Sequence, residues 1–120
     1  MAKRGSTKWL SVRQEEHIAY RYQGTRSASS GGAATDQGDV RTTHQLIECK
    51  TTGTFDKPAK SISIKLDDLE KIADEAWSEN REPVLALRIY NPDSVLSDND
   101  GNVDLIVRLL TDDIRSRYHR

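Results

Sequence analysis

Residues 45–51 read Gln-Leu-Ile-Glu-Cys-Lys-Thr and mix apolar with charged side chains in one short run. Successive side chains of a strand point to opposite faces of its sheet. A strand here places Ile47 and Cys49 on one face and both Glu48 and Lys50 on the other. A carboxylate within so apolar a run is costly unless it is paired or binds a metal ion. The run therefore predicts a buried strand that presents Glu48 and Lys50 together.

A second strand is expected just before this one, at residues 40–43, with a short turn near His44. Asp39 directly precedes it. If residues 39–43 pair with residues 46–51, neighbouring side chains on one face of the pair lie close together. The pairing predicts that the Asp39 carboxylate reaches the place from which Glu48 and Lys50 project.

The rest of the chain alternates helical and strand patterns. Apolar residues recur at helical spacing in two segments, the first with Ser11 as a candidate N-cap and Gly24 as a natural stop. The other runs are short and strand-like. We expect helices at 11–23 and 66–77, strands at 61–65, 84–90 and 103–110, and a short helix after residue 111. This order predicts an α/β fold with one mixed sheet flanked by helices.

Length and composition favour one domain spanning residues 1–120. Hydrophobic residues make up 35% of the chain, which is low for a globular protein but too high for a disordered one. A chain this short buries only about two thirds of its unfolded surface, so an oligomer interface is expected. The single cysteine excludes an internal disulfide, and no apolar run suits a signal peptide or a membrane span. We expect a soluble, cytoplasmic protein without a membrane partner.

Charge and local composition add three expectations. Residues 1–65 hold 11 Lys and Arg against 6 Asp and Glu, whereas residues 66–120 hold 7 against 13. A basic first half could meet a polyanion. Residues 1–8 are expected to form a flexible tail. The polar segments 27–38 and 52–60 are expected to be mobile loops beside a site, because long loops in small domains are often functional.

Asp39, Glu48 and Lys50 supply the carboxylates and the ammonium group that metal-dependent phosphodiester hydrolysis uses. Mg²⁺ takes oxygen ligands, often one or two carboxylates, with waters and substrate phosphate completing its shell. Such a metal ion polarises the phosphate and activates water, and a nearby ammonium stabilises the developing charge. We expect Asp39 and Glu48 to bind Mg²⁺, for which Mn²⁺ is expected to substitute. The Cys49 backbone carbonyl is a further candidate ligand, and no organic cofactor is expected.

Several segments in order resemble archaeal-type and phage Holliday junction resolvases of the PD-(D/E)xK superfamily. They are Ser30-Gly31, Gly38-Asp39-Val40-Arg41 and Leu46-Ile47-Glu48-Cys49-Lys50-Thr51-Thr52, with Glu15-x-x-Ile18-Ala19 before them and Lys60-Ser61 after them. Gly38 departs from the proline that names the motif. The resemblance implies a restriction-endonuclease-like fold with an α-β-β-β-α-β core. It also implies a metal-dependent homodimer that cuts four-way DNA junctions.

The resemblance also assigns roles to single residues. Asp39 and Glu48 correspond to metal ligands, Lys50 to the catalytic lysine, and Ser30 to a loop serine that approaches the scissile phosphate. Glu15 corresponds to a helix carboxylate that reaches the metal directly or through water. Glu16 is the rival, but Glu15 is preferred because it shares a helical face with apolar residues.

Candidate DNA contacts and competing functions complete the expectations. Basic and polar residues near the expected site could contact phosphates without reading sequence. These candidates are Arg13, Arg26, Arg41, Lys57, Lys60, Ser61 and Lys65. Trp9 could pack against a partner subunit or stack on DNA, and packing is favoured. The leading function is a Holliday junction resolvase; the alternatives are a less selective nicking or flap nuclease and a non-catalytic DNA-binding module.

Overall fold

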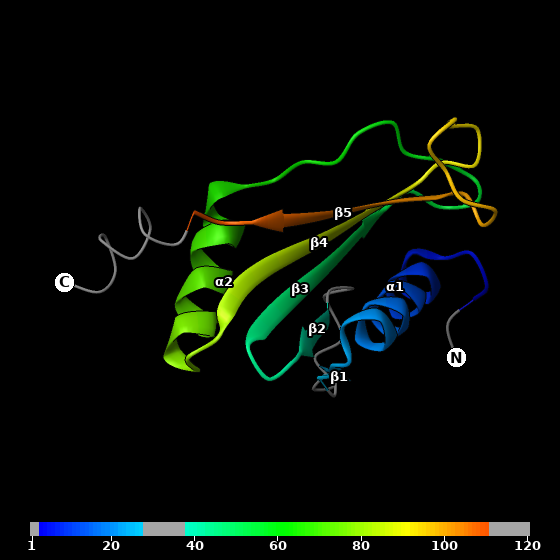
Figure 1. Ribbon diagram of the computed structural model, residues 1–120. Coiled ribbons are helices and arrows are strands. Elements are labelled where there is room, and N and C mark those ends of the chain that lie inside the picture. The colour runs from blue at the N-terminus through cyan, green and yellow to red at the C-terminus, as the bar shows by residue number, and fades with distance from the viewer. Residues whose placement is uncertain (1–2, 28–37, 111–120) are drawn as a thin grey trace.

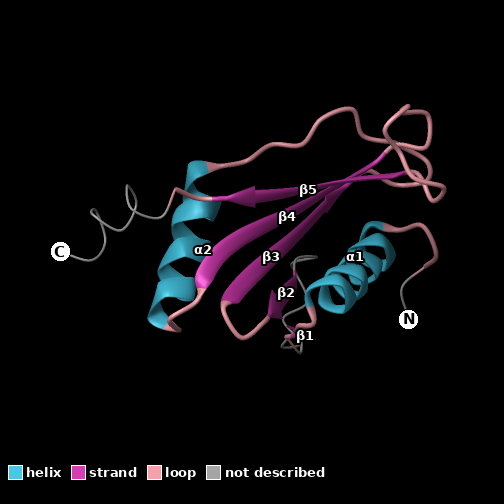
Figure 2. Cartoon of the chain, viewed as in Figure 1, coloured by secondary structure: helices cyan, strands magenta, loops and turns pink. Residues whose placement is uncertain are grey.

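Two helices cover opposite faces of a five-stranded mixed sheet (Figures 1 and 2). The computed structural model describes residues 3–27 and 38–110. Its elements, in chain order, are α1 (Thr7–Tyr22), β1 (Thr25–Arg26), β2 (Gly38–Arg41), β3 (Gln45–Thr52), α2 (Leu66–Ser78), β4 (Glu82–Tyr90) and β5 (Asn102–Arg108). The expected α/β domain with a mixed sheet is confirmed.

The strands lie in the order β1-β2-β3-β4-β5. β3 and β4 are parallel, and every other neighbouring pair is antiparallel. Parallel neighbours need a long crossover connection, which the segment from residue 53 to the end of α2 supplies. This crossover brings the start of α2 to the half of β3 that carries Glu48 and Lys50.

The face of the sheet under α1 is apolar. Ile18 of α1 packs against Val40, Ile47, Cys49 and residues of β4 in one buried cluster. Val40 and Ile47 are cross-strand partners, and both are fully buried. The expected alternation along β3 is therefore confirmed, because its odd-numbered residues 47 and 49 form this core.

The other face of the sheet is covered by α2. Leu46 packs there with Ile72 and Ala76 in a second buried cluster. Leu46 lies one position from Ile47 along β3, so the strand buries side chains on both faces. Glu48 and Lys50 follow Leu46 at intervals of two and share its face. The chain thus places two charged residues beside a packed helix.

The first helix begins earlier than expected. Ser6, rather than Ser11, is the N-cap, and its side chain accepts a hydrogen bond from the Trp9 backbone nitrogen at 3.2 Å. Ser11 is buried within the helix. Residues 7 and 8, expected in a flexible tail, form the first turn. A cap oxygen that satisfies an exposed helix N–H decides such a start, and the Ser6 side chain supplies that oxygen here.

Residues 61–65 form no strand, contrary to expectation. Their alternation of serine and isoleucine suits an edge, but no edge is open beside them. β3 already pairs with β2 and β4, and β4 pairs with β3 and β5. The segment instead crosses the α2 face of the sheet as an extended connection. Thr25–Arg26 supplies the unexpected first strand by pairing with β2.

Several boundaries also differ from expectation. β2 begins at residue 38 and ends at 41, and β5 ends at residue 108. Part of the loop 53–60 is held by backbone hydrogen bonds, including Ala59 N to the Tyr90 carbonyl at 2.9 Å; its mobility stays a prediction. The expected terminal helix lies outside the described residues. No helix among those described is long and apolar enough to cross a membrane.

Candidate active site

Asp39 and Glu48 are direct cross-strand partners in the antiparallel pair of β2 and β3. Partners in such a pair project from the same face, and that face is the one under α2. Both side chains are half-buried. The pairing that the sequence suggested between residues 39–43 and 46–51 is found for residues 39–41 with 46–48, and it brings two carboxylates together.

The environment of this pair disfavours two negative charges. Burial, together with the charges of Asp39 and Asp68, raises the pKa of Glu48 to about 7. Burial and the charge of Glu75 likewise raise the pKa of Asp39, against a lowering effect of Arg41. Carboxylates that repel one another in a partly dry place are stabilised by a cation.

Lys50 lies two residues beyond Glu48 on the same face of β3. Its Nζ donates a hydrogen bond to the backbone carbonyl of Ser63 at 2.9 Å. An ammonium has three donors, so this bond holds Lys50 in position and leaves two donors for other acceptors. The connection at 61–65, which the sequence suggested as a strand, thus serves to orient this lysine.

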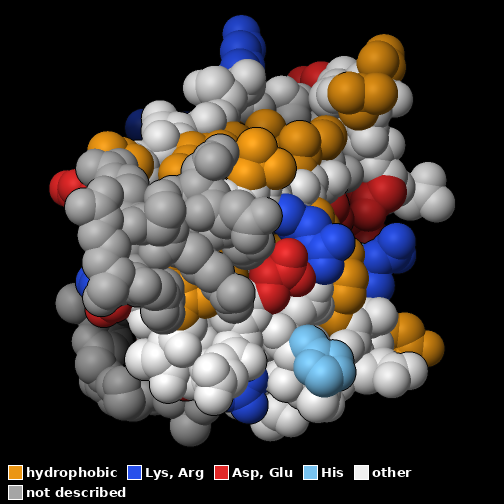
Figure 3. Space-filling model, turned by 60° about the vertical axis from the view of Figure 1, so that its left-hand side comes forward, with side chains coloured by type: hydrophobic (Ala, Val, Ile, Leu, Met, Phe, Trp, Pro, Cys, Tyr) orange, Lys and Arg blue, Asp and Glu red, His pale blue; other side chains and the backbone are white. Residues whose placement is uncertain are grey.

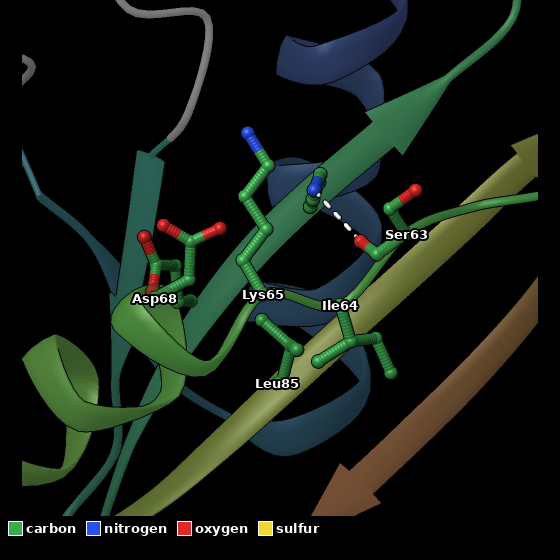
Figure 4. Close-up of a pocket in the computed structure, with 7 residues that line it drawn as sticks. Ser63, Ile64, Lys65, Asp68 and Leu85 are labelled. Carbon is green, nitrogen blue, oxygen red and sulfur yellow. Dashed lines mark hydrogen bonds between the residues drawn. The ribbon is translucent and has the colours of Figure 1, made fainter.

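Asp68 joins the site from α2 and was not expected there. A small pocket is lined by Glu48, Lys50, Asp68, Lys65 and the apolar residues beside them. Figure 4 shows Asp68 at the start of α2, with Ser63 and Ile64 on the connection that precedes it. Acidic residues in the first turn of a helix complement its dipole, so the position of Asp68 does not by itself indicate a site.

A topological signal could have identified Asp68. A helix that connects two parallel strands runs back across the sheet, so its first turn lies near the end of the first strand. Asp67 also lies in that turn, but its side chain is exposed. The choice between neighbouring acidic residues therefore depended on the orientation of the helix.

Glu15 is not brought into this group. It lies on the buried side of α1, which packs on the opposite face of the sheet, whereas Glu16 is exposed. The orientation preferred from the sequence is right, but the carboxylate accepts hydrogen bonds from Arg26 at 3.1 and 3.2 Å. Its charge contributes to the raised pKa of Asp39. A role for Glu15 as a metal ligand stays a prediction.

The predictions for Cys49 and Ser30 have different outcomes. The Cys49 side chain is buried in the core under α1, and burial raises the pKa of its thiol. It is therefore a structural residue rather than a nucleophile. Its backbone lies inside the sheet between Gly38 and Ala86, and metal binding by its carbonyl stays a prediction. Ser30 lies outside the described residues.

The candidate DNA contacts do not form one surface. Lys65 lines the pocket of Glu48, and Lys57, Lys60 and Ser61 are exposed on the connection that leads to it. Arg13 instead lies over the Trp9 ring in a cavity on the α1 face. On the face drawn in Figure 3, acidic and basic side chains lie next to one another below a band of hydrophobic ones.

Two of the candidate arginines are engaged within the protein. Arg26 is paired with Glu15. Arg41 contacts Glu79 at 2.8 Å and Glu75 at 3.0 Å, and its hydrogen bond lowers the pKa of Glu79 to about 2. A phosphate would have to compete with these carboxylates. The sequence could not show this, because the partners are far away along the chain.

The donor set at the site suits a hard cation. Within residues 3–27 and 38–110, no group of three or more His, Cys, Asp or Glu side chains could hold a metal ion. Structural and catalytic zinc sites use three or four protein ligands. Mg²⁺ accepts one or two carboxylates and keeps waters, and Asp39 and Glu48 provide that number of oxygen donors.

Comparisons with known proteins found no similar protein. No family model, no curated protein and no solved structure matches the chain.

Proposed function

We propose that this protein is a Mg²⁺-dependent DNA endonuclease whose active site contains Asp39, Glu48 and Lys50. The observation that carries the proposal is the register of β2 and β3, which sets two half-buried carboxylates side by side. Lys50 shares their face. Acidic pairs of this kind suit a hard divalent cation, and the lysine adds a positive charge for a phosphate.

Each residue has a separate role in this proposal. Asp39 and Glu48 hold the metal ion, which when bound polarises the phosphodiester and makes water a better nucleophile. Lys50 directs its two remaining donors to a phosphate oxygen and stabilises charge that develops there. Ser63 positions Lys50 through its carbonyl. Asp68 adds negative charge near the two carboxylates, which favours cation binding.

The finer proposal is a homodimeric Holliday junction resolvase with a restriction-endonuclease-like fold. The resemblance in the sequence suggests this substrate, and the sheet order supports the fold, since β3 and β4 are parallel and joined through α2. Junction selectivity would follow from the spacing of two active sites in a dimer, because phosphate contacts read shape rather than bases.

Cleavage of a synthetic four-way junction with Mg²⁺ tests the catalytic proposal. Glu48→Gln and Lys50→Met should each reduce the rate by about 100-fold or more, the effect of losing one transition-state contact. Glu16→Gln is the matched control, because Glu16 is an exposed glutamate on α1. Wild-type rates in Glu48→Gln would reject the site, and no cleavage with Mg²⁺ or Mn²⁺ would favour a non-catalytic DNA-binding module.

The choice of substrate is tested separately. Linear duplex, flap and single-stranded DNA are cut in parallel with the junction at equal protein concentration. A resolvase cuts the junction at least about tenfold faster than the others. Equal rates on all four substrates would retain the endonuclease and replace the resolvase by a less selective nicking or flap nuclease.

A further inference from the structure

A second cavity lies on the α1 face of the sheet, away from Glu48 and Lys50. Its volume is about 130 Å³, several times the roughly 30 Å³ that one water occupies in the liquid. Its lining comes from the start of α1, the loop 53–60, the end of β4 and the start of β5. Three arginines and three aromatic residues dominate its lining: Arg4, Arg13, Arg88, Trp9, Phe55 and Tyr90.

The aromatic side chains form a continuous wall. The Phe55 ring stacks on Tyr90 with centroids 5.3 Å apart and meets Trp9 edge-on at 6.0 Å. Gly5 gives Phe55 its room, because a Cβ at residue 5 would lie 2.6 Å from the Phe55 ring. Phe55 nevertheless remains about half exposed. A half-exposed ring fixed beside a cavity is suited to stack on another flat ring.

The arginines make the cavity positive. The guanidinium carbons of Arg13 and Arg4 lie 4.8 and 5.9 Å from the centre of the Trp9 ring. Neither arginine forms an ion pair within the described part of the chain. Asp100 is the acidic residue in the lining, so positive charge is in excess there. The two arginines are therefore available to an anion.

Arg88 adds a fixed and buried donor. It forms a two-pronged ion pair with Asp104 at 2.7 and 3.0 Å through Nε and Nη2. The Arg88 side chain is only 5% exposed. This pair holds the guanidinium rigidly, and Nη1 remains for a further acceptor.

The cavity also contains an acceptor without a donor. The Oδ1 atom of Asn102 is buried and has no hydrogen-bond partner among the described residues. Asn102 is 9% exposed and lines the cavity, opposite Tyr90 in the pair of β4 and β5. Buried polar atoms in proteins nearly always have a partner. The Asn102 amide is therefore a group whose hydrogen bonding is incomplete at this end of the cavity.

We propose that this cavity binds a nucleoside phosphate unit. Its base stacks on the aromatic wall beside Asn102, and its phosphate lies against Arg4 and Arg13. Stacking combined with arginine contacts is how proteins hold unpaired nucleotides without reading sequence. The unit comes either from a free nucleotide or from an unpaired nucleotide of a DNA strand. The site lies on the other face of the sheet and does not depend on the proposed nuclease activity.

Nuclear magnetic resonance of ¹⁵N-labelled protein tests the site directly. Deoxythymidine monophosphate, a five-residue oligo-dT, inorganic phosphate and thymidine are titrated separately in EDTA, which prevents cleavage. The backbone amides of Phe55, Tyr90 and Asn102 should shift with the mononucleotide, the oligonucleotide or both. Binding of the oligonucleotide alone identifies a DNA strand as the source. Equal binding of the mononucleotide identifies a free nucleotide.

Variants separate this cavity from general charge attraction. Arg13→Gln and Phe55→Leu should each weaken nucleotide binding about tenfold or more, because each removes one of the two recognising features. Arg21→Gln is the matched control, since Arg21 is an exposed arginine on the same helix outside the cavity. An equal loss with Arg21→Gln would overturn the proposal. So would phosphate binding as tightly as the nucleotide, or no shift at Asn102 at millimolar nucleotide.

Discussion

Replacing Glu48 by glutamine should change how the stability of the metal-free protein depends on pH. Burial raises the pKa of Glu48 from 4.5 to about 7, so the folded state favours the protonated carboxyl. The unfolded chain ionises near pH 4.5. Stability from this group is therefore complete below pH 4.5, is lost as pH rises through about 7, and is absent above it. Glu48→Gln carries no such charge and should not show this loss.

The size of the effect follows from the two pKa values. A rise from 4.5 to about 7 corresponds to about 3.4 kcal/mol at full effect, since one pKa unit is about 1.4 kcal/mol. Glu48 is only half-buried, and solvent screening reduces such effects. We therefore expect Glu48→Gln to gain about 1–2 kcal/mol over the wild type between pH 5 and pH 8.

Urea denaturation in EDTA across this pH range measures the difference. Adding Mg²⁺ at pH 8 should stabilise the wild type, because a ligand that binds the folded state raises stability, and should not stabilise Glu48→Gln to the same extent. Glu16→Gln is the control for loss of an exposed charge. Parallel pH profiles for the wild type and Glu48→Gln would refute the reasoning about this carboxylate pair.

Three further predictions concern the α1 side of the protein. The Cys49 thiol should react with a disulfide reagent at pH 8 only after unfolding, because it is buried with a raised pKa; fast labelling of the folded protein would contradict this. Gln14→Leu should lower the unfolding free energy by about 1–3 kcal/mol, since Gln14 donates to the Ala86 carbonyl at 3.0 Å and accepts from Thr51. An unchanged urea midpoint would count against those bonds. Ser6→Ala should cost about 0.5–2 kcal/mol through loss of the helix cap, measured by thermal unfolding, and an unchanged melting temperature would count against Ser6 as the cap.

Much of the sheet could be predicted from the sequence because its signals are local. Period-two alternation over residues 45–51 is a property of the strand itself, so the faces of Ile47 and Glu48 followed directly. That the strand after Asp39 pairs with the strand of Glu48 was also suggested, because a short turn joins neighbouring antiparallel strands, and the structure places Asp39 opposite Glu48. These local rules were sufficient to bring the two carboxylates of the candidate site together.

The tertiary structure decided what depends on distant partners. Residues 61–65 alternate like a strand but lie beside β3 and β4, which are paired on both sides, so they become the connection whose Ser63 carbonyl holds Lys50. Asp68 joins Glu48 only because α2 crosses back over β3. Arg41 meets acidic residues about 35 positions away.

The second cavity also depends on contacts between segments that are far apart in the chain. Phe55 and Asn102 are unremarkable in the sequence, and the sequence left Trp9 open between packing and stacking on DNA. The fold brings all three to one place with Arg13. The sequence by itself determined which side chains share a strand face, since backbone geometry sets that locally. Only the fold determined which faces, helix ends and loops meet, because those contacts are made by packing between segments far apart in the chain.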